Sequence, residues 1–93
     1  MSFEKLSKVK LTYNEEKILK FYLSSFYEYR AITTTRLVRE LGYNNSSAWK
    51  YLNSLVRKGV FIEVVHGNPS TYEINDDFLL IYEERKRKEI VNY

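Results

Sequence analysis

The residue types that most often perform catalysis or bind metals are nearly absent from this chain. Its 93 residues include no cysteine and a single histidine, His66. Without cysteine there is neither a disulfide framework nor a thiolate metal site, and one histidine argues against a catalytic relay. The acidic pairs Glu15–Glu16 and Asp76–Asp77 open expected helices, where the helix dipole stabilises carboxylates. The sequence therefore predicts a protein that is not an enzyme and holds no metal or cofactor.

The chemistry that the sequence favours is the binding of a polyanion. The net charge is +3, but residues 1–60 hold 11 Lys or Arg against 5 Asp or Glu, whereas residues 61–93 hold 4 against 7. Between residues 30 and 58 the only acid is Glu40. The basic residues of that stretch are Arg30, Arg36, Arg39, Lys50, Arg57 and Lys58. Such a stretch beside an acidic end is typical of a polyanion binder, although unevenly scattered surface charge gives the same counts.

Length and hydropathy favour one small domain. A chain of 93 residues suits a single core, because a core of fewer than about 50 residues is hard to stabilise. The longest apolar run, Phe78 to Tyr82, is far shorter than the ~20 residues that span a bilayer. The first residues contain no apolar stretch after a basic cluster, so no secretion signal is expected. We therefore expect a soluble, cytoplasmic protein without a membrane or small-molecule partner.

The first part of the chain is expected to hold one long helix. Residues 1–10 form either a loose basic arm or a short leading helix. Thr12 and Glu15 make a capping-box pattern that opens a helix over about 13–28. Phe21 falls on the polar side of this helix, where it is either simply exposed, covered by the N-terminal segment, or in a subunit contact. The apolar stripe of this helix is Ile18, Leu19, Tyr22 and Phe26, with Leu23 at its edge.

Two short helices follow and are joined by a tight turn. A β-branched run from Ile32 allows one short strand pairing before a helix that begins at about Thr34 and ends at Gly42. Asn44 is a good N-cap for a second helix over about 45–58, which Gly59 ends. Two short helices around a glycine-containing turn form a helix-turn-helix. The buried stripe of the second helix is Ala48, Leu52, Leu55 and Val56.

After the second helix the apolar period changes from 3.6 to 2. The segments 60–65 and 70–74 suit strands, and the turn residues between them predict a β-hairpin. Asn75 or Asp76 caps a final helix over about 77–91. The first turn of this helix is apolar on every side, which predicts cover from more than the chain's own core, and hence a second subunit. The expected dimer residues are Phe21, Phe78, Leu79, Leu80, Ile81 and Tyr82.

The ordered pattern from Ile32 to Ile74 resembles the winged helix-turn-helix domain. The matching positions are Thr33–Thr35, Leu37, Leu41-Gly42-Tyr43, Asn44, Leu52, Leu55, Gly59 and Ile62. The resemblance implies an α+β fold with a three-helix core, a two-stranded hairpin wing and a C-terminal helix. Its expected divisions are an arm or short helix at 1–10, the winged domain at 11–75 and a dimerisation helix at 76–93.

Small regulators of the MarR, ArsR and PadR types are similar to this pattern, and so are short winged-helix proteins of viruses and plasmids of thermophilic archaea. The resemblance implies a homodimeric transcription regulator that binds specific sequences of double-stranded DNA. If the source is viral, the protein is expected in the cytoplasm of the host cell. The alternative is a winged-helix module that binds another protein and does not read DNA, because a shared fold does not imply a shared function.

In the DNA-binding interpretation, the second helix of the pair enters the major groove. Its outward positions, which contain no acid, are Asn45, Ser46, Trp49, Lys50 and Asn53. Thr34 and Thr35 are placed to hold a phosphate at a helix N-terminus, although at least one of them is expected merely to cap it. Further phosphate partners are Arg36, Arg39, Arg57 and Lys58, the last two of which serve the helix dipole equally well.

Two parts of this interface depart from the simplest expectation. Trp49 either packs against the wing or the first helix of the pair, meets a thymine methyl or sugar in the groove, or contacts a protein. The expected wing contains no Lys or Arg, so it gives backbone and amide contacts to DNA or none at all. The wing-tip residues considered for these contacts are His66, Gly67, Asn68 and Ser70.

The C-terminal charge run resembles a nucleic-acid-binding tail only superficially. Glu83 and Arg87, and likewise Glu84 and Lys88, are spaced four residues apart in the favourable order for ion pairs on a helix. A self-paired, solvated helix is therefore the better interpretation of this run.

Overall fold

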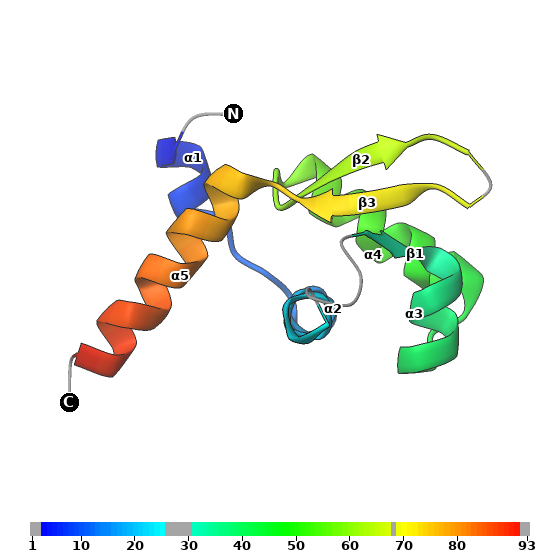
Figure 1. The fold of residues 1–93 in the computed structure, drawn as a ribbon, viewed down its shortest axis with the longest axis horizontal. Coiled ribbons are helices and arrows are strands. Elements are labelled where there is room, and N and C mark those ends of the chain that lie inside the picture. The colour runs from blue at the N-terminus through cyan, green and yellow to red at the C-terminus, as the bar shows by residue number, and fades with distance from the viewer. Residues whose placement is uncertain (1–2, 26–30, 68, 92–93) are drawn as a thin grey trace.

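A computed structural model describes residues 3–25, 31–67 and 69–91, with side chains as far as residue 88. The described residues form an α+β structure with five helices and one antiparallel sheet. The elements are α1 (Phe3–Ser7), α2 (Tyr13–Ser24), β1 (Ile32–Thr33), α3 (Thr34–Leu41), α4 (Asn45–Arg57), β2 (Phe61–Val65), β3 (Thr71–Ile74) and α5 (Asp76–Val91). Helices α1 and α5 lie at one end of the molecule, and the hairpin of β2 and β3 projects at the other (Figure 1).

Most of the expected helix boundaries are confirmed. Thr12 and Glu15 form the capping box that opens α2, and the Asn44 side chain accepts a hydrogen bond from the Ser47 N–H at 2.7 Å to cap α4. Gly42 ends α3 with φ 76°, a left-handed conformation that glycine adopts without strain. The prediction for α2 was too long at its C-terminus, since the helix ends at Ser24; residues 26–28 lie outside the described part of the chain.

Two further boundaries differ from expectation by one or two residues. The cap of α3 is Thr33, whose hydroxyl accepts the Arg36 N–H at 3.2 Å, so the capping role expected of Thr34 or Thr35 is wrong. The final helix begins at Asp76, and the Asn75 side chain accepts the Asp77 N–H at 3.1 Å. No helix in the described part of the chain is long and apolar enough to cross a membrane.

The predicted hairpin is confirmed, and β1 adds a third strand to it. The strand order is β1-β3-β2, and both pairings are antiparallel. Ile32 pairs with Tyr72 and Phe61 with Ile74, which places these four side chains on the face that packs against the helices. The register shifts between Glu63 and Val65. Because β3 is the central strand, β2 is an edge strand, and its residues after Phe61 are exposed.

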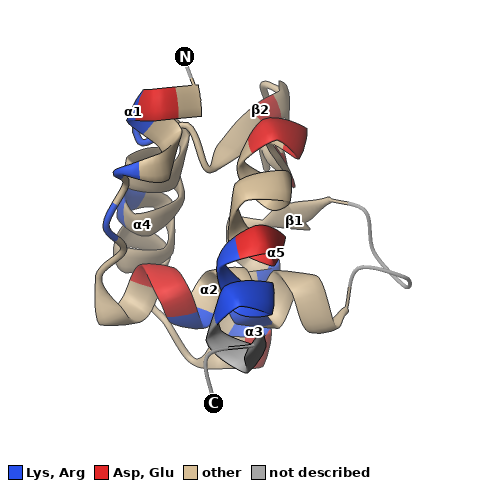
Figure 2. Cartoon of the chain, turned by 90° about the vertical axis from the view of Figure 1, so that its left-hand side faces the viewer, with Lys and Arg blue, Asp and Glu red and all other residues tan. Residues whose placement is uncertain are grey.

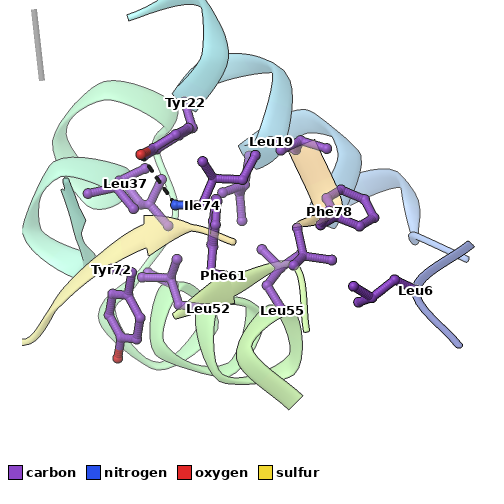
Figure 3. Close-up of a cluster of buried hydrophobic side chains, with 14 residues drawn as sticks. Leu6, Leu19, Tyr22, Leu37, Leu52, Leu55, Phe61, Tyr72, Ile74 and Phe78 are labelled. Atoms are coloured by element: carbon purple, nitrogen blue, oxygen red, sulfur yellow. Dashed lines mark hydrogen bonds between the residues drawn. The ribbon is translucent and has the colours of Figure 1, made fainter. Parts of the chain in front are cut away.

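The core lies between the sheet and the helices α2, α3, α4 and α5 (Figure 3). Phe61, which is 1% exposed, lies within this core. The Tyr22 ring lies 5.2 Å from the Phe61 ring, and its hydroxyl accepts the Ile74 N–H at 3.3 Å. Burial raises the pKa of Tyr22. These contacts hold α2 against β2 and β3.

Helix α1 supplies cover for α5 that the sequence pattern assigned to a second subunit. Phe78 is buried in the core of the chain, and α1 packs against α5 with Leu6 fully buried. Residues 3–7 thus adopt the short leading helix, one of the two alternatives for the N-terminal segment. The Arg85 guanidinium also donates a hydrogen bond to the Ser7 carbonyl oxygen. Leu80 remains 59% exposed on α5.

Candidate nucleic-acid interface

The outward face of α4 carries no acid, and among its five predicted reading residues only Lys50 is charged. Ala48, Leu52 and Leu55 are fully buried, which turns the opposite side of the helix to solvent. Of the predicted reading residues, Asn45, Ser46, Trp49 and Lys50 are exposed and Asn53 is half-buried. No Asp or Glu occurs anywhere in α4. The structure thus brings all five predicted residues onto one open helical surface.

Trp49 is not covered by the chain itself. The indole is 57% exposed, so the interpretation in which it packs against the wing or α3 does not hold. A large aromatic side chain in water represents apolar area that association would bury. Trp49 is therefore a candidate contact residue, whether the partner is DNA or protein.

Helix α3 contributes two arginines, Arg36 and Arg39, whose surroundings differ. Arg39 is exposed, with its Nε 3.6 Å from the Glu40 carboxylate. Arg36 lies against α2, with its guanidinium 5.4 Å from the centroid of the Phe21 ring. Phe21 itself is half-buried and packs against the core, which accounts for an apolar residue on the polar side of α2. Of the two threonines that open α3, Thr35 is exposed and Thr34 half-buried.

The two basic residues at the end of α4 have separate roles. Arg57 is exposed. Lys58 is turned inward: its Nζ lies 2.5 Å from the Glu15 carboxylate and donates to the Lys10 carbonyl oxygen at 3.0 Å. This ion pair favours a structural role for Lys58 over the predicted phosphate contact, because the ammonium group already balances a buried charge. The sequence pattern suggested a phosphate contact or an interaction with the helix dipole for Lys58, and it gave no sign of the distant partner Glu15.

Glu15 is the buried partner, with a side chain only 2% exposed. Burial by itself would raise the pKa of this carboxyl, but hydrogen bonds from Lys58, Ser54 and the Thr12 backbone outweigh it and lower the pKa from 4.5 to about 2. The Ser54 hydroxyl donates to the carboxylate at 2.6 Å. Glu15 therefore joins the start of α2 to the last turn of α4 as a charged, fully bonded group.

A second, uncharged network joins α2 to the other half of α4. The Asn14 side chain donates to the Tyr51 hydroxyl at 3.0 Å and accepts from the Tyr43 hydroxyl at 3.0 Å. The Tyr43 and Tyr51 rings meet edge-to-face with their centroids 5.3 Å apart. The Lys17 ammonium lies 5.6 Å from the centroid of the Tyr43 ring. Sequence reasoning missed this network, since its residues are far apart in the chain.

The hairpin presents a different surface. His66 and Gly67 are exposed and Ser70 is half-buried, while Asn68 lies outside the described residues. The His66 Nδ1 lies 3.1 Å from the Glu63 carboxylate, and this contact lowers the pKa of Glu63. The Gly67 N–H donates to the Ser70 hydroxyl at 3.2 Å. Three aliphatic residues of β2 are about half exposed: Ile62, Val64 and Val65.

The residues predicted to form a dimer contact divide into two groups. Phe78 is buried, and Phe21, Leu79, Ile81 and Tyr82 are half-buried against the core. Leu80 is the member of the set that is largely exposed.

The described residues contain no group of three or more His, Cys, Asp or Glu side chains that could hold a metal ion.

The sequence matches no family model, no curated protein and no solved structure.

Proposed function

We propose that this chain is a winged helix-turn-helix protein that binds double-stranded DNA through α4. The observation that carries the proposal is the acid-free outward face of α4, on which Asn45, Ser46, Lys50 and Asn53 present hydrogen-bonding groups. A merely solvated helix face ordinarily mixes glutamate with lysine. DNA excludes glutamate in most such positions because phosphate repels it, and it favours asparagine and lysine at base edges.

The major groove is about 12 Å wide and admits one helix, with the N-terminal residues of that helix nearest to the bases. Asn45 and Asn53 carry amides that suit bidentate pairing with adenine, and Lys50 suits guanine or a phosphate. Exposed Arg39, Thr35 and Arg57 flank this helix face and are proposed to hold phosphates. Arg36 is proposed as an additional phosphate partner that is oriented by the Phe21 ring.

A homodimeric regulator of transcription is the proposed biological role. Two copies would place their α4 helices in successive major grooves about 34 Å apart and would recognise a near-palindrome. Helix α1 packs against α5, and each exposes one large apolar side chain, Phe3 on α1 and Leu80 on α5. These two side chains supply the apolar surface proposed for the pairing. Since Phe78 is buried and Leu79, Ile81 and Tyr82 are half-buried against the core, this surface is smaller than the sequence pattern implied.

The proposal is tested by titrating a labelled duplex of mixed sequence with the protein and following fluorescence anisotropy at several salt concentrations. Six to ten phosphate contacts would lower the affinity about 10³- to 10⁵-fold between 50 and 200 mM salt. Lys50→Glu, on the open face, is expected to weaken binding strongly, whereas Lys86→Glu on α5 is the control. Absence of binding by the wild-type protein at 50 mM salt would overturn the proposal.

A second candidate function is the binding of another protein through the hairpin. The observation that favours it is the exposure of Ile62, Val64 and Val65 on an edge strand that carries no Lys or Arg. Edge strands with apolar, unguarded side chains pair readily with other chains. The two candidate functions use separate surfaces, because the hairpin and the outward face of α4 share none of these residues. Substitutions on one surface therefore test one function without altering the other.

A further inference from the structure

Helix α2 carries a cation that neither the fold nor the predicted interface uses. Lys17 is exposed, and in the described part of the chain its ammonium contact is the face of the Tyr43 ring, at 5.6 Å from the centroid. A cation above an aromatic ring is attracted by the ring quadrupole but keeps its full charge. The arrangement therefore orders the side chain and leaves the charge available to an external anion.

The Tyr43 ring is itself held in place. Its hydroxyl donates to the Asn14 side chain at 3.0 Å, and its ring packs edge-to-face against Tyr51. Asn14 also donates to the Tyr51 hydroxyl at 3.0 Å, which closes the network across α2, the turn and α4. Burial raises the pKa of Tyr43, so the hydroxyl stays protonated and keeps its donor role. The support beneath Lys17 is rigid because three elements contribute to it.

This support connects Lys17 to the turn that precedes α4 and places it on the flank of that helix. Tyr43 directly precedes Asn44, the N-cap of α4, and Asn45 and Ser46 begin the outward face. The contacts from α2 fall on Tyr51, Ser54 and Lys58, so α2 runs along one flank of α4. Figure 2 shows the first turn of α2 and helix α4 on the same side of the molecule.

The surface around Lys17 has room for a phosphate group. A shallow hollow of about 220 Å³ is lined by Tyr13, Glu16, Lys17 and Lys20. Tyr13 is 80% exposed and presents a hydroxyl there. The one acid of the hollow, Glu16, is paired with Lys20 at 3.4 Å, so the net charge of these four side chains is that of Lys17.

We infer that Lys17 binds a DNA backbone phosphate on the flank of the groove that α4 enters, and that Asn14, Tyr43 and Tyr51 position it for this contact. The inference rests on the proposed DNA binding and extends it to a helix outside the helix-turn-helix. Phosphate rows border the major groove on both sides of an inserted helix, so a cation on the flank of α4 is placed on the side of one of them. The contact carries no base preference.

The test compares Lys17→Gln with Lys88→Gln, which removes an equal charge from an exposed position on α5, outside the proposed interface. Each variant is titrated against the same labelled duplex at salt concentrations from about 50 to about 200 mM, after thermal melting has shown that it folds. Lys17→Gln is expected to make the slope of log affinity against log salt less negative by about 0.9, the value for one released contact. The ratio of wild-type to variant affinity then falls about threefold across this range.

Lys88→Gln is expected to leave the slope unchanged, and Lys17→Arg is expected to restore it because the charge returns. Lys17→Gln should weaken binding equally for duplexes of different sequence. If the wild type binds with a steep salt dependence and Lys17→Gln has the same slope as Lys88→Gln, the phosphate contact is overturned while the proposed function stands. If the wild type does not bind at all, the proposed function fails and this inference fails with it.

Discussion

Helix α4 and the β2–β3 hairpin are both surface elements of the proposed winged helix, but they are built differently. Helix α4 is fixed to α2 at two heights, through Glu15 and through Asn14, and it turns an acid-free polar face outward. Beyond its root the hairpin has local contacts such as that between His66 and Glu63, and it exposes aliphatic side chains. One element is anchored and suited to phosphate and bases, whereas the other is neither.

This difference leads us to expect DNA recognition by α4 and not by the hairpin. A reading helix must be held in position, because a small displacement misaligns bidentate hydrogen bonds. A strand pair with Glu63 and Glu73, and without Lys or Arg, offers phosphate no cationic side chain. We therefore expect changes in α4 and its supports to alter stability and DNA affinity, and changes in the exposed residues of the hairpin to alter neither by much.

The largest effect is expected from the charged anchor of α4. Glu15→Gln leaves the Lys58 ammonium, which is 31% exposed, without its carboxylate partner, and should lower the free energy of unfolding by about 2–3 kcal/mol. Urea titration followed by circular dichroism measures this. Glu16→Gln removes an equal charge from the surface pair with Lys20 and should change stability by less than about 0.5 kcal/mol. Equal effects of the two substitutions would contradict the anchoring role.

The same anchor predicts a pH dependence. The pKa of Glu15 falls from 4.5 to about 2 on folding, so its stabilisation is complete above about pH 4.5 and is lost as the pH falls towards 2. Urea titrations of the wild type and Glu15→Gln over this range should show their stabilities converging as the pH falls. A difference that stays constant from pH 5 to pH 2.5 would show that the carboxylate charge is not responsible.

The next effect concerns base recognition by the outward face. Asn53→Ala is expected to weaken binding to a preferred duplex by about 1–3 kcal/mol and to relax the choice of base at one position. The selection of preferred duplexes from a random pool, followed by anisotropy titration, measures both quantities. Ser70→Ala at the hairpin tip is the matched polar substitution and should change neither. A loss of base preference in Ser70→Ala alone would transfer the reading role to the hairpin.

A smaller effect is expected on self-association. Leu80→Glu places a charge on the exposed apolar position of α5 and should raise the dimer dissociation constant at least about tenfold, or about 1.4 kcal/mol. Ile62→Glu makes the same change on the exposed side of β2. Sedimentation equilibrium of both variants distinguishes the two surfaces. If Ile62→Glu dissociates the dimer and Leu80→Glu does not, the hairpin is the pairing surface.

The smallest effect is expected from the acid of the hairpin. Glu63→Gln removes a negative charge that is exposed and paired with His66, so stability should change by less than about 0.5 kcal/mol. DNA affinity should stay constant or rise slightly, because one source of repulsion from phosphate is removed. Anisotropy titration at 50 mM salt checks this. A marked loss of affinity would mean that the hairpin contacts DNA after all.

Local signals in the sequence predicted the helix ends and the hairpin well. Thr12 with Glu15, Asn44 and Gly42 each act within a few residues, so their patterns are visible before folding. The burial of Ala48 and Leu52 followed from helical periodicity, which in turn placed the reading residues outward. These features need no knowledge of the tertiary structure.

Long-range partners could not be predicted in the same way. The ion pair of Lys58 with Glu15 joins residues 43 positions apart, and Asn14 meets Tyr51 across 37 positions. Nothing in the local pattern distinguishes a lysine that ends a helix at the surface from one that neutralises a buried acid. The cover that α1 gives α5 through Leu6 is likewise a tertiary fact, and it replaces part of the subunit contact that periodicity alone suggested.

The most direct test of the central claim uses the single tryptophan of the chain, which lies on the outward face of α4 and is 57% exposed. Its emission is followed while mixed-sequence duplex DNA is added at about 50 and about 200 mM salt. If α4 docks in the major groove, the emission of Trp49 changes and saturates as DNA is added, and the affinity falls steeply with salt. Binding that leaves the emission of Trp49 unchanged, or no binding at the lower salt, would contradict docking of α4 in the groove.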